Sequence, residues 1–474
     1  MRKMNFKILV WIVGSVLGFS SCSNFLEVDP VGKTTISVFF SDMDGMRAAV
    51  PGAYSVMYSY YDGEFYQYGD VASDIVNLNI LGSDVDMIEQ YNFTSSPDDE
   101  AEAVGHIWKN IYEALANVNN ILKYQPLLLE KIPKNSEELQ LIKGEALFLR
   151  ALCHFDLCRV YAQPYNYSTD ASHIGIPILL ETPGPDDKVK RNTVKQVYKQ
   201  IIEDLLNSEK CFGDMPMVDV YHGSKKSVQA LLSRVYLYME DWKNVIKYST
   251  SVIDESLLCY GKEYLNMYNG SNSADEAIFR LNGKEKRSTL SKFYSSKTAI
   301  AFPSKKLMDL FNDPNDIRLG LFKMEKGSNS ISLKHELNKL VQEGEQKNDP
   351  FVLRVSEMYL NRAEAHLNRD ELELAAADVK VIMARAVEKD VAEISLPYSD
   401  KEALRIIIEN ERTREFCFEG QRFFDITRQK NDLVRDDESS SSVKHITYPS
   451  DLFILPIPQA ELNANLDMEP NGVN

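Results

Sequence analysis

The sequence predicts a mainly α-helical protein, an irregular array of helix pairs joined by long loops, with a few short strands. Apolar residues recur at helical spacing along most of the 474-residue chain, whereas strand-like segments are few and short. The clearest helix begins near Thr193, which has capping-box spacing with Gln196. Its apolar residues fall on one stripe: Val194, Val197, Tyr198, Ile201, Ile202, Leu205 and Leu206.

The first 21 residues have the pattern of a targeting signal. The basic residues Arg2, Lys3 and Lys7 precede an apolar run of twelve, residues 8–19. A helix of that length spans about 18 Å, too short for the roughly 30 Å of a bilayer. Two serines and Cys22 follow, so the segment resembles a bacterial lipoprotein signal, cleaved before Cys22, which then carries the lipids. An ordinary secretory signal with an incidental cysteine is the alternative.

Helix pairs account for much of the remaining chain. Segment 139–161 is apolar on more than one face, which predicts a helix enclosed by neighbours. Segments 226–254 and 355–386 each read as two helices joined by a tight turn, and they resemble tetratricopeptide repeats at irregular spacing. Strand signals are confined to 276–282 and 451–458. We expect one domain over 22–474, with an N-terminal part to about 255 and a C-terminal part from about 256.

Composition excludes several classes of function. The formal net charge is −17, and removing the three basic residues of the signal lowers it to −20, which makes nucleic acid an unsuitable partner. The cysteines after Cys22 are odd in number and form no CxxC pair, so we expect free thiols. The histidines show no zinc-binding spacing, and we expect neither a metal nor a cofactor.

The segment 411–428, ERTREFCFEGQRFFDITR, alternates charged and aromatic residues. Its predicted i,i+3 pairs are Glu409–Arg412, Glu411–Arg414 and Arg412–Glu415. A neighbouring cation lowers the pKa of a carboxyl group, which is unsuitable for a general acid. We therefore predict that this segment stabilises the fold, with a left-handed helix end at Gly420, and that it holds no catalytic residues.

Several motifs in a fixed order resemble the SusD/RagB family of outer-membrane nutrient-binding lipoproteins. The resemblance covers nearly all of the chain after the signal. The ending LDMEPNGVN departs from the family's usual tail. The motifs that carry the resemblance are CSNFLEVDP (22–30), IWKNIYEALANVNNIL (107–122), GEALFLRALCHFDLCRVYAQP (144–164), FPSKKLMDLFNDPNDIR (302–318), RVSEMYLNRAEAHLN (354–368), ERTREFCFEGQRFFDITR (411–428) and ILPIPQAEL (454–462).

This resemblance implies a SusD-like fold and a binding function without catalysis. A protein of this family would bind a nutrient, most often an oligosaccharide or polysaccharide, at the cell surface. It would deliver that nutrient to a SusC-like TonB-dependent outer-membrane transporter. A peptide-binding member of the same fold is the first alternative. A glycoside hydrolase, which needs two carboxylates about 5–10 Å apart in a cleft, is the second.

Candidate ligand-binding residues were sought among exposed aromatics and carboxylates, which suit sugar faces and hydroxyls. Trp108 and Trp242 lie on apolar helical stripes and are expected in the core. The segment after the helix break at Gly63 predicts an exposed lip, and the family resemblance adds the Asp of its SD dipeptide, which is Asp74 here. These candidates, with a second loop at 291–296, are Tyr66, Tyr68, Asp70, Asp74, Phe293 and Tyr294. The alternatives are that the tyrosines pack between helices and that the second loop is a mobile tip.

Overall fold

The computed structural model describes residues 35–80, 85–99, 102–184, 187–268, 276–283, 287–295, 299–324, 330–332, 334 and 348–472. The expected signal and Cys22 lie outside these ranges. Within them, every helix is too short or too polar to cross a membrane.

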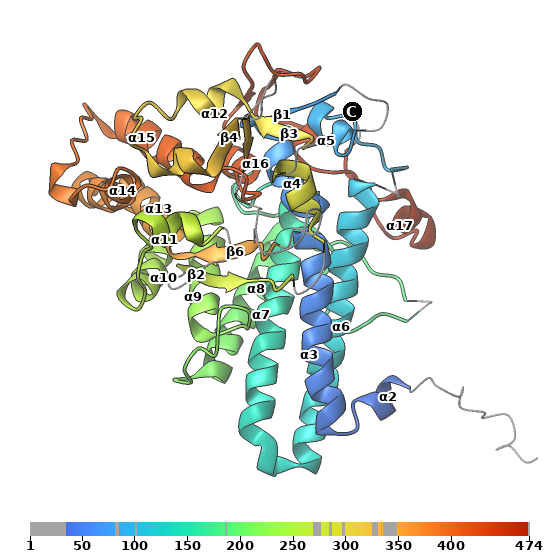
Figure 1. Ribbon diagram of the computed structural model, residues 1–474. Helices are drawn as coiled ribbons and strands as arrows, with labels where there is room; N and C mark the ends of the chain where they lie inside the picture. Colours follow the sequence, from blue (N-terminus) through green and yellow to red (C-terminus); the bar gives the residue numbers. More distant parts are fainter. Residues whose placement is uncertain are drawn as a thin grey trace, which may run out of the picture.

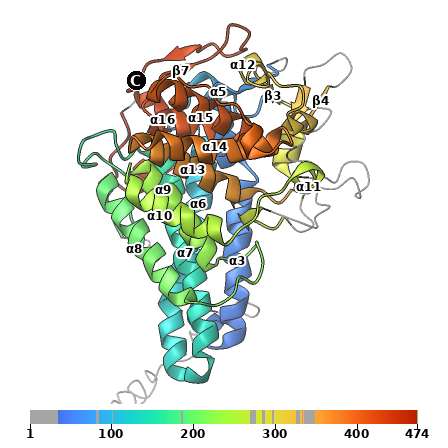
Figure 2. The same cartoon turned by 90° about the vertical axis from the view of Figure 1, so that its left-hand side faces the viewer.

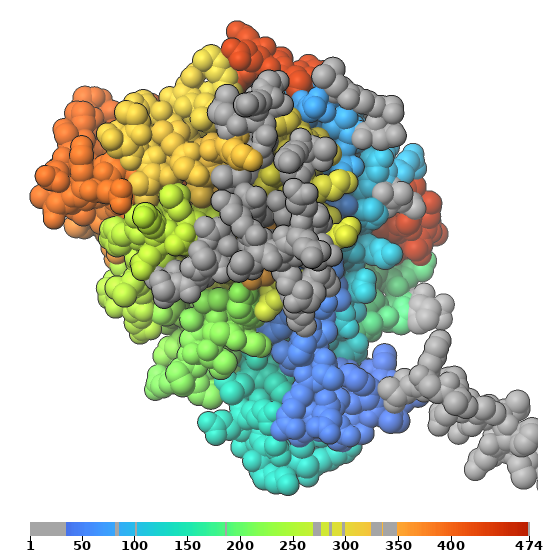
Figure 3. All heavy atoms as spheres, viewed as in Figure 1, coloured from blue at the N-terminus to red at the C-terminus, as the bar shows by residue number. Residues whose placement is uncertain are grey.

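Three long helices form the N-terminal half of the fold. They are α3 (Met43–Tyr61), α6 (Ala103–Lys131) and α7 (Ser136–Tyr161), and they lie side by side (Figure 1). The turn between α6 and α7 forms one end of the molecule (Figure 3). Helix α8 (Val194–Phe212) packs along α7. Shorter helices accompany them: α2 (Ile36–Phe39), α4 (Glu64–Val71) and α5 (Ile88–Asn92).

The predicted helix pairs are confirmed. The first pair is α9 (Lys225–Tyr238) with α10 (Trp242–Asp254), and the second is α13 (Val355–Asn368) with α14 (Leu372–Ala386). Helix α10 also packs against α13, so the two pairs stack (Figure 2). The predicted capping box of Thr193 and Gln196 is present at the start of α8.

The C-terminal half adds helices at the opposite end from the α6–α7 turn (Figure 2). Helix α15 (Lys401–Phe416) packs against α13 and α14, and α16 (Arg422–Arg428) packs against α4. The expected left-handed residue is present, since Gly420 has φ of 66°. The remaining helices are α11 (Gly261–Asn266), α12 (Lys305–Asp309) and α17 (Gln459–Ala464).

The described strands form two-stranded antiparallel sheets. Strand β2 (Ala277–Arg280) pairs with β6 (Phe351–Arg354), which confirms a strand within 276–282. The strand expected over 451–458 is wrong, because Asp451–Phe453 form a 3₁₀ turn and the following residues pair with no strand. The other pairs are β1 (Val76–Leu78) with β3 (Ala301–Pro303), β4 (Phe322–Met324) with β5 (Ser330–Ser332), and β7 (Leu433–Val434) with β8 (His445–Ile446).

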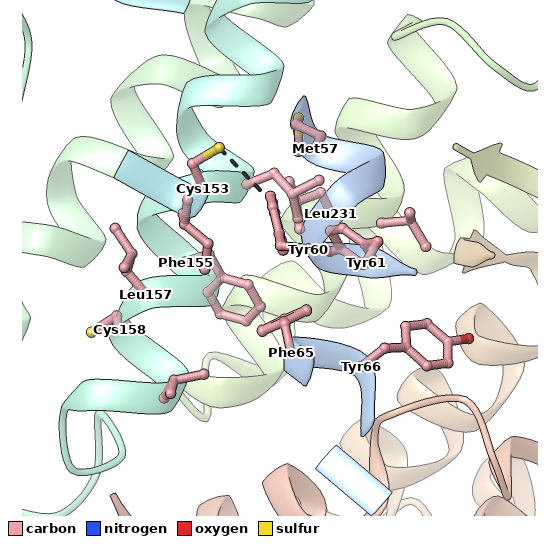
Figure 4. Packing of buried hydrophobic residues seen from close by; sticks show 14 of the residues in the cluster. Met57, Tyr60, Tyr61, Phe65, Tyr66, Cys153, Phe155, Leu157, Cys158 and Leu231 are labelled. Atoms are coloured by element: carbon pink, nitrogen blue, oxygen red, sulfur yellow. Dashed lines mark hydrogen bonds between the residues drawn. The ribbon is translucent and has the colours of Figure 1, made fainter. Parts of the chain in front are cut away.

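One large apolar core runs through the molecule, from α3 to residues near the C-terminus. In its centre, Tyr60 lies against α7, where its hydroxyl contacts the sulfur of Cys153 at 3.9 Å (Figure 4). The described cysteines are free, as expected. Trp108 is buried, and Trp242 is half-buried against the same core.

Candidate functional site

The exposed lip expected at Tyr66, Tyr68, Asp70 and Asp74 is wrong. The chain does break at Gly63, but it continues as α4, and every residue of α4 after Glu64 is buried. The reason is that α4 packs between α6 and α16. The exposure expected of the second loop is wrong too, since Phe293 and Tyr294 are buried in a π-helical turn, Ser291–Ser295. All six side chains are at most 3% exposed.

The buried candidates make contacts that hold the fold together. The Tyr66 hydroxyl donates to the carbonyl of Phe351 at 3.3 Å, and Tyr68 packs edge-on against Phe423. Asp70 accepts hydrogen bonds from the Tyr294 hydroxyl and the Gly420 amide, each at 3.1 Å. A ligand at the surface would not reach these rings.

Asp74 has a structural partner on each side. It lies 2.8 Å from Arg422 Nε and 2.8 Å from Lys306 Nζ. Burial alone would raise the pKa of Asp74, but Arg422 and Lys306 outweigh it and hold the pKa well below its usual value. A carboxylate fixed in this way is already neutralised and has little left to offer a ligand.

The charged segment 411–428 is buried and self-paired, which confirms its predicted structural role. Of the three predicted pairs only Glu411–Arg414 is present, at 2.5 Å. The other two are wrong, because each residue pairs elsewhere. Arg412 binds Asp425 of α16 at 2.8 Å, and Glu409 binds Arg405, one turn earlier on the same helix.

Glu415 lies at the centre of this network. Arg385, Arg354 and Arg318 approach its carboxylate at 2.5, 2.5 and 3.1 Å. Burial alone would raise the pKa of Glu415, but the three arginines outweigh it and hold the pKa well below its usual value. A lowered pKa makes Glu415 unsuitable as a general acid near neutral pH, and its partners fix it in a structural position.

An open cavity of about 590 Å³ lies beside the buried candidates, where α3 ends and α4 begins. Its volume falls within the range of small-molecule sites. The end of α3, the start of α4, the segment 85–90 and the start of α6 surround it. Its described lining is Tyr58, Ser59, Asp62, Gly63, Glu64, Gln67, Val85, Asp86, Met87, Ile88, Glu89, Gln90, Glu102, Ala103, His106 and Thr289.

Two buried glutamines present free amide groups to this cavity. Gln67 is 6% exposed, and its side chain makes no hydrogen bond with the described residues. Gln90 is 2% exposed and donates to Ser95 Oγ at 3.0 Å, while its carbonyl oxygen has no described partner. Buried amides are nearly always hydrogen-bonded in folded proteins. Gln67 is therefore poised to bind a polar group that enters the cavity.

Asp62 lines the cavity and binds Thr289, another lining residue. It accepts hydrogen bonds from Ser288 Oγ at 2.6 Å and from the Thr289 amide at 2.9 Å. Burial raises the pKa of Asp62 to about 6, although these donors favour the charged form. The carboxylate ties the end of α3 to the segment 287–295, which is far away in sequence.

The segment on the far side of the cavity is held in a strained conformation. Met87 and Phe93, which flank α5, have φ values of 67° and 56° in the left-handed region. Such values cost on the order of 1–3 kcal/mol for a residue other than glycine, and they cluster at ligand sites. Met87, Glu89 and Gln90 of this segment line the cavity.

A second cavity of about 710 Å³ lies between α6 and α17. Its lining includes Trp108 and Tyr112, whose rings lie 4.7 Å apart. Both polar tips are occupied, since Tyr112 donates to the Pro177 carbonyl at 3.2 Å and Trp108 to Glu461 at 3.4 Å. This cavity is more apolar than the first and offers a sugar fewer free polar groups.

The expected lip lies on the segment that borders the cavity, but the side chains predicted to bind do not line it. Tyr66 and Tyr68 are buried in α4. Glu64 and Gln67, spaced i,i+3, share the face that meets the cavity. A helix predicted over Glu64–Val71 would have placed Glu64 and Gln67 on one face. The contribution of residues 85–90 had no sequence signal, because only folding brings them near α4.

Comparison with known proteins identifies the family. Residues 24–237 match the family described as "Starch-binding associating with outer membrane", and residues 265–472 match the "SusD family". SusD-like protein P38 of Formosa agariphila is 25% identical over 254 residues, which cover 52% of this chain and 45% of that protein. SusD-like protein P2 of the same organism is 22% identical, over 56% of this chain and 51% of that protein. The chain thus spans about half the length of these curated relatives.

Solved structures show the same fold. A SusD superfamily protein from Bacteroides thetaiotaomicron superposes with a TM-score of 0.80 at 24% identity, covering 91% of this chain and 100% of that chain. A putative sugar binding protein from Bacteroides vulgatus gives 0.79 at 24% identity, covering 91% and 98%. These matches confirm the expected helical SusD-like architecture. The chain belongs to the SusD/RagB family.

Proposed function

We propose that this protein binds an oligosaccharide or polysaccharide in the 590 Å³ cavity and delivers it to a SusC-like TonB-dependent transporter. Family membership supports nutrient binding in general. The observation that carries the assignment to this cavity is the buried, unpartnered amide of Gln67. An amide both donates and accepts, as a sugar hydroxyl does, so each can satisfy the other.

The cavity supplies further groups for several hydroxyls. The carbonyl oxygen of Gln90 can accept, and the carboxylates of Glu64 and Glu89 can accept charge-assisted hydrogen bonds. The Tyr58 ring borders the same cavity but is only 3% exposed, so the cavity offers mainly polar groups. Polar groups on several sides suit a ligand with several hydroxyls.

Titration with a panel of soluble glycans tests the site. Gln67→Met keeps the side-chain volume and removes the amide, and we expect affinity to fall up to about tenfold, the worth of one hydrogen bond. Gln229→Met is the matched control, because Gln229 is also buried but lies on α9, where it binds Glu209 at 2.8 Å. Equal loss in both variants would contradict the assignment. Binding of peptides alone would favour the peptide alternative.

We also propose binding without turnover. The charged network is saturated by its own partners, which supports this. Incubation of bound glycans with the purified protein, followed by chromatography, should return them unchanged. Shorter products that persist through repurification and depend on the cavity carboxylates would favour the hydrolase alternative.

Membrane attachment through Cys22 remains a proposal that rests on the signal sequence and on the family's outer-membrane description. Two or three acyl chains make anchoring stable where one does not. Cell fractionation should find the wild type in the outer membrane and Cys22→Ser in the soluble fraction. Wild-type protein without fatty-acid label would contradict the proposal. Co-purification of the anchored protein with a TonB-dependent transporter tests the partner.

A further inference from the structure

The described lining of the 590 Å³ cavity has a one-sided charge. Five acidic residues line it, and the described lining contains no lysine or arginine. Its single basic side chain, His106, lies 2.9 Å from Glu64 and is engaged there. The five acidic residues are Asp62, Glu64, Asp86, Glu89 and Glu102.

We propose that the cavity selects its saccharide by charge, preferring amino-bearing units to neutral ones and rejecting units that carry carboxylate or sulfate. This inference rests on the proposed glycan-binding function and names the chemical class within it. The free amide of Gln67 marks where a ligand binds, and the carboxylates decide which ligand.

Electrostatics within the cavity support this order. A cleft lined by charge of one sign with low-dielectric walls concentrates the opposite charge and repels the same charge. An anionic sugar would approach several carboxylates, and the described lining offers it no lysine or arginine. An ammonium group would be attracted by each of these carboxylates.

One pair of carboxylates already shows the repulsion. Glu89 and Glu102 both line the cavity, and a slight burial together with the nearby Glu89 and Asp99 raises the pKa of Glu102. A ligand cation beside Glu89 and Glu102 would relieve this repulsion. The 710 Å³ cavity has a weaker bias, because Lys109 lines it together with Glu181 and Glu461.

The experiment compares three oligosaccharides with the same β-1,4-linked backbone, built from glucosamine, glucose or glucuronic acid, beside a glycan array sorted by charge. We expect the amino form to bind tightest and the acidic form at least about tenfold more weakly, because each exposed charge contact contributes about 0.2–1 kcal/mol. The preference should shrink as salt concentration rises.

The double variant Glu89→Gln/Glu102→Gln should reduce the ratio of amino to acidic affinity by about fivefold or more. Asp44→Asn is the control for the loss of a surface carboxylate far from the cavity. Asp44 is 93% exposed and lies in the first turn of α3, whereas Asp62 follows the last turn. The two are separated by about 27 Å of helix, several Debye lengths in physiological salt. The control should leave the ratio unchanged.

The outcomes separate the two proposals. Acidic glycans that bind the wild type as tightly as amino glycans, and lose affinity in Gln67→Met, would overturn charge selection while the glycan function stands. An array on which no glycan of any class binds would overturn the glycan function. Trilysine and triglutamate peptides would then be compared, and no preference for trilysine would overturn charge selection as well.

Discussion

At the scale of single residues, the surroundings of each carboxylate decide its role. Asp62, Asp70 and Asp74 lie within one short stretch of the chain. Asp74 has two cations, Asp62 has neutral donors beside a cavity, and Asp70 is enclosed with one oxygen, Oδ1, unpaired. Burial raises the pKa of Asp70 to about 8, since the Tyr294 and Gly420 donors only partly compensate.

Asp70 makes stability depend on pH. Its folded-state pKa lies above the unfolded value of 3.8, so the folded protein holds a proton that the unfolded chain releases. This contribution is fully present below pH about 4 and is lost as pH rises through about 8. Asp70→Asn resembles the protonated form. We expect the free energy of unfolding of the variant, relative to wild type, to rise by on the order of 3 kcal/mol between pH 5 and 8.

Urea unfolding at both pH values measures this difference. Asp74→Asn is the control with the opposite sign, because the pKa of Asp74 is lowered by Arg422 and Lys306. That variant should be destabilised at neutral pH, with the deficit shrinking in acid. Identical pH profiles for wild type and Asp70→Asn would show that Asp70 is ionised in the fold.

At the scale of elements, backbone-to-backbone contact fixes α4 against the turn before α16. A Cβ on Gly69 would lie 2.0 Å from the Gly420 carbonyl oxygen, and a Cβ on Gly420 would lie 2.7 Å from the Tyr66 oxygen. No side chain can move aside to relieve these contacts. The close approach also sets the direction of α4, and therefore the place of Gln67 at the cavity.

Gly69→Ala tests this contact. The added methyl group must push α4 away from the Gly420 turn. We therefore expect the free energy of unfolding to fall by more than about 2 kcal/mol, as in an overpacked core. Gly52→Ala in α3 is the matched control, since a Cβ there meets no atom within 4 Å. It should stabilise by about 0.5–1 kcal/mol through helix propensity. Thermal unfolding compares the two, and a neutral Gly69→Ala would contradict the contact.

At the scale of the whole molecule, one ionic network joins segments from across the chain. Arg354 at the end of β6 binds Glu276 at 2.7 Å, Glu415 at 2.5 Å and Glu419 at 2.8 Å. Arg385 of α14 binds Glu276 and Glu415 as well. All of these groups are buried, so each carboxylate depends on its cations. The network locks the helix pairs to the C-terminal helices.

Arg354→Met should therefore destabilise the whole fold. It keeps the apolar stem and leaves three carboxylates short of a cation, and breaking a buried ion pair costs about 3–5 kcal/mol. Arg405→Met is the matched control on α15, because Arg405 is 38% exposed and pairs with the exposed Glu402. This control should lower the free energy of unfolding by less than about 1 kcal/mol. Chemical denaturation distinguishes them, and similar losses would contradict a structural network.

The sequence by itself determined the local structure. Periodic apolar stripes, the Thr193 capping box and the left-handed Gly420 depend on residues close in the chain, so helices and turns could be predicted from them. The motifs in their order also identified the family. Even the charged segment was assigned correctly to structure, because its residue types imply pairing wherever the partners lie.

Only the tertiary structure decided which side of each element is buried and which charged residues form ion pairs. Arg412 meets Asp425 and Glu415 meets Arg354, since buried charges take the partners that packing brings within reach. Tyr66 and Tyr68 are covered because α16 packs on α4, and Gln67 lines a cavity together with residues 85–90. A cavity exists only between elements distant in sequence, and no local pattern can encode its position.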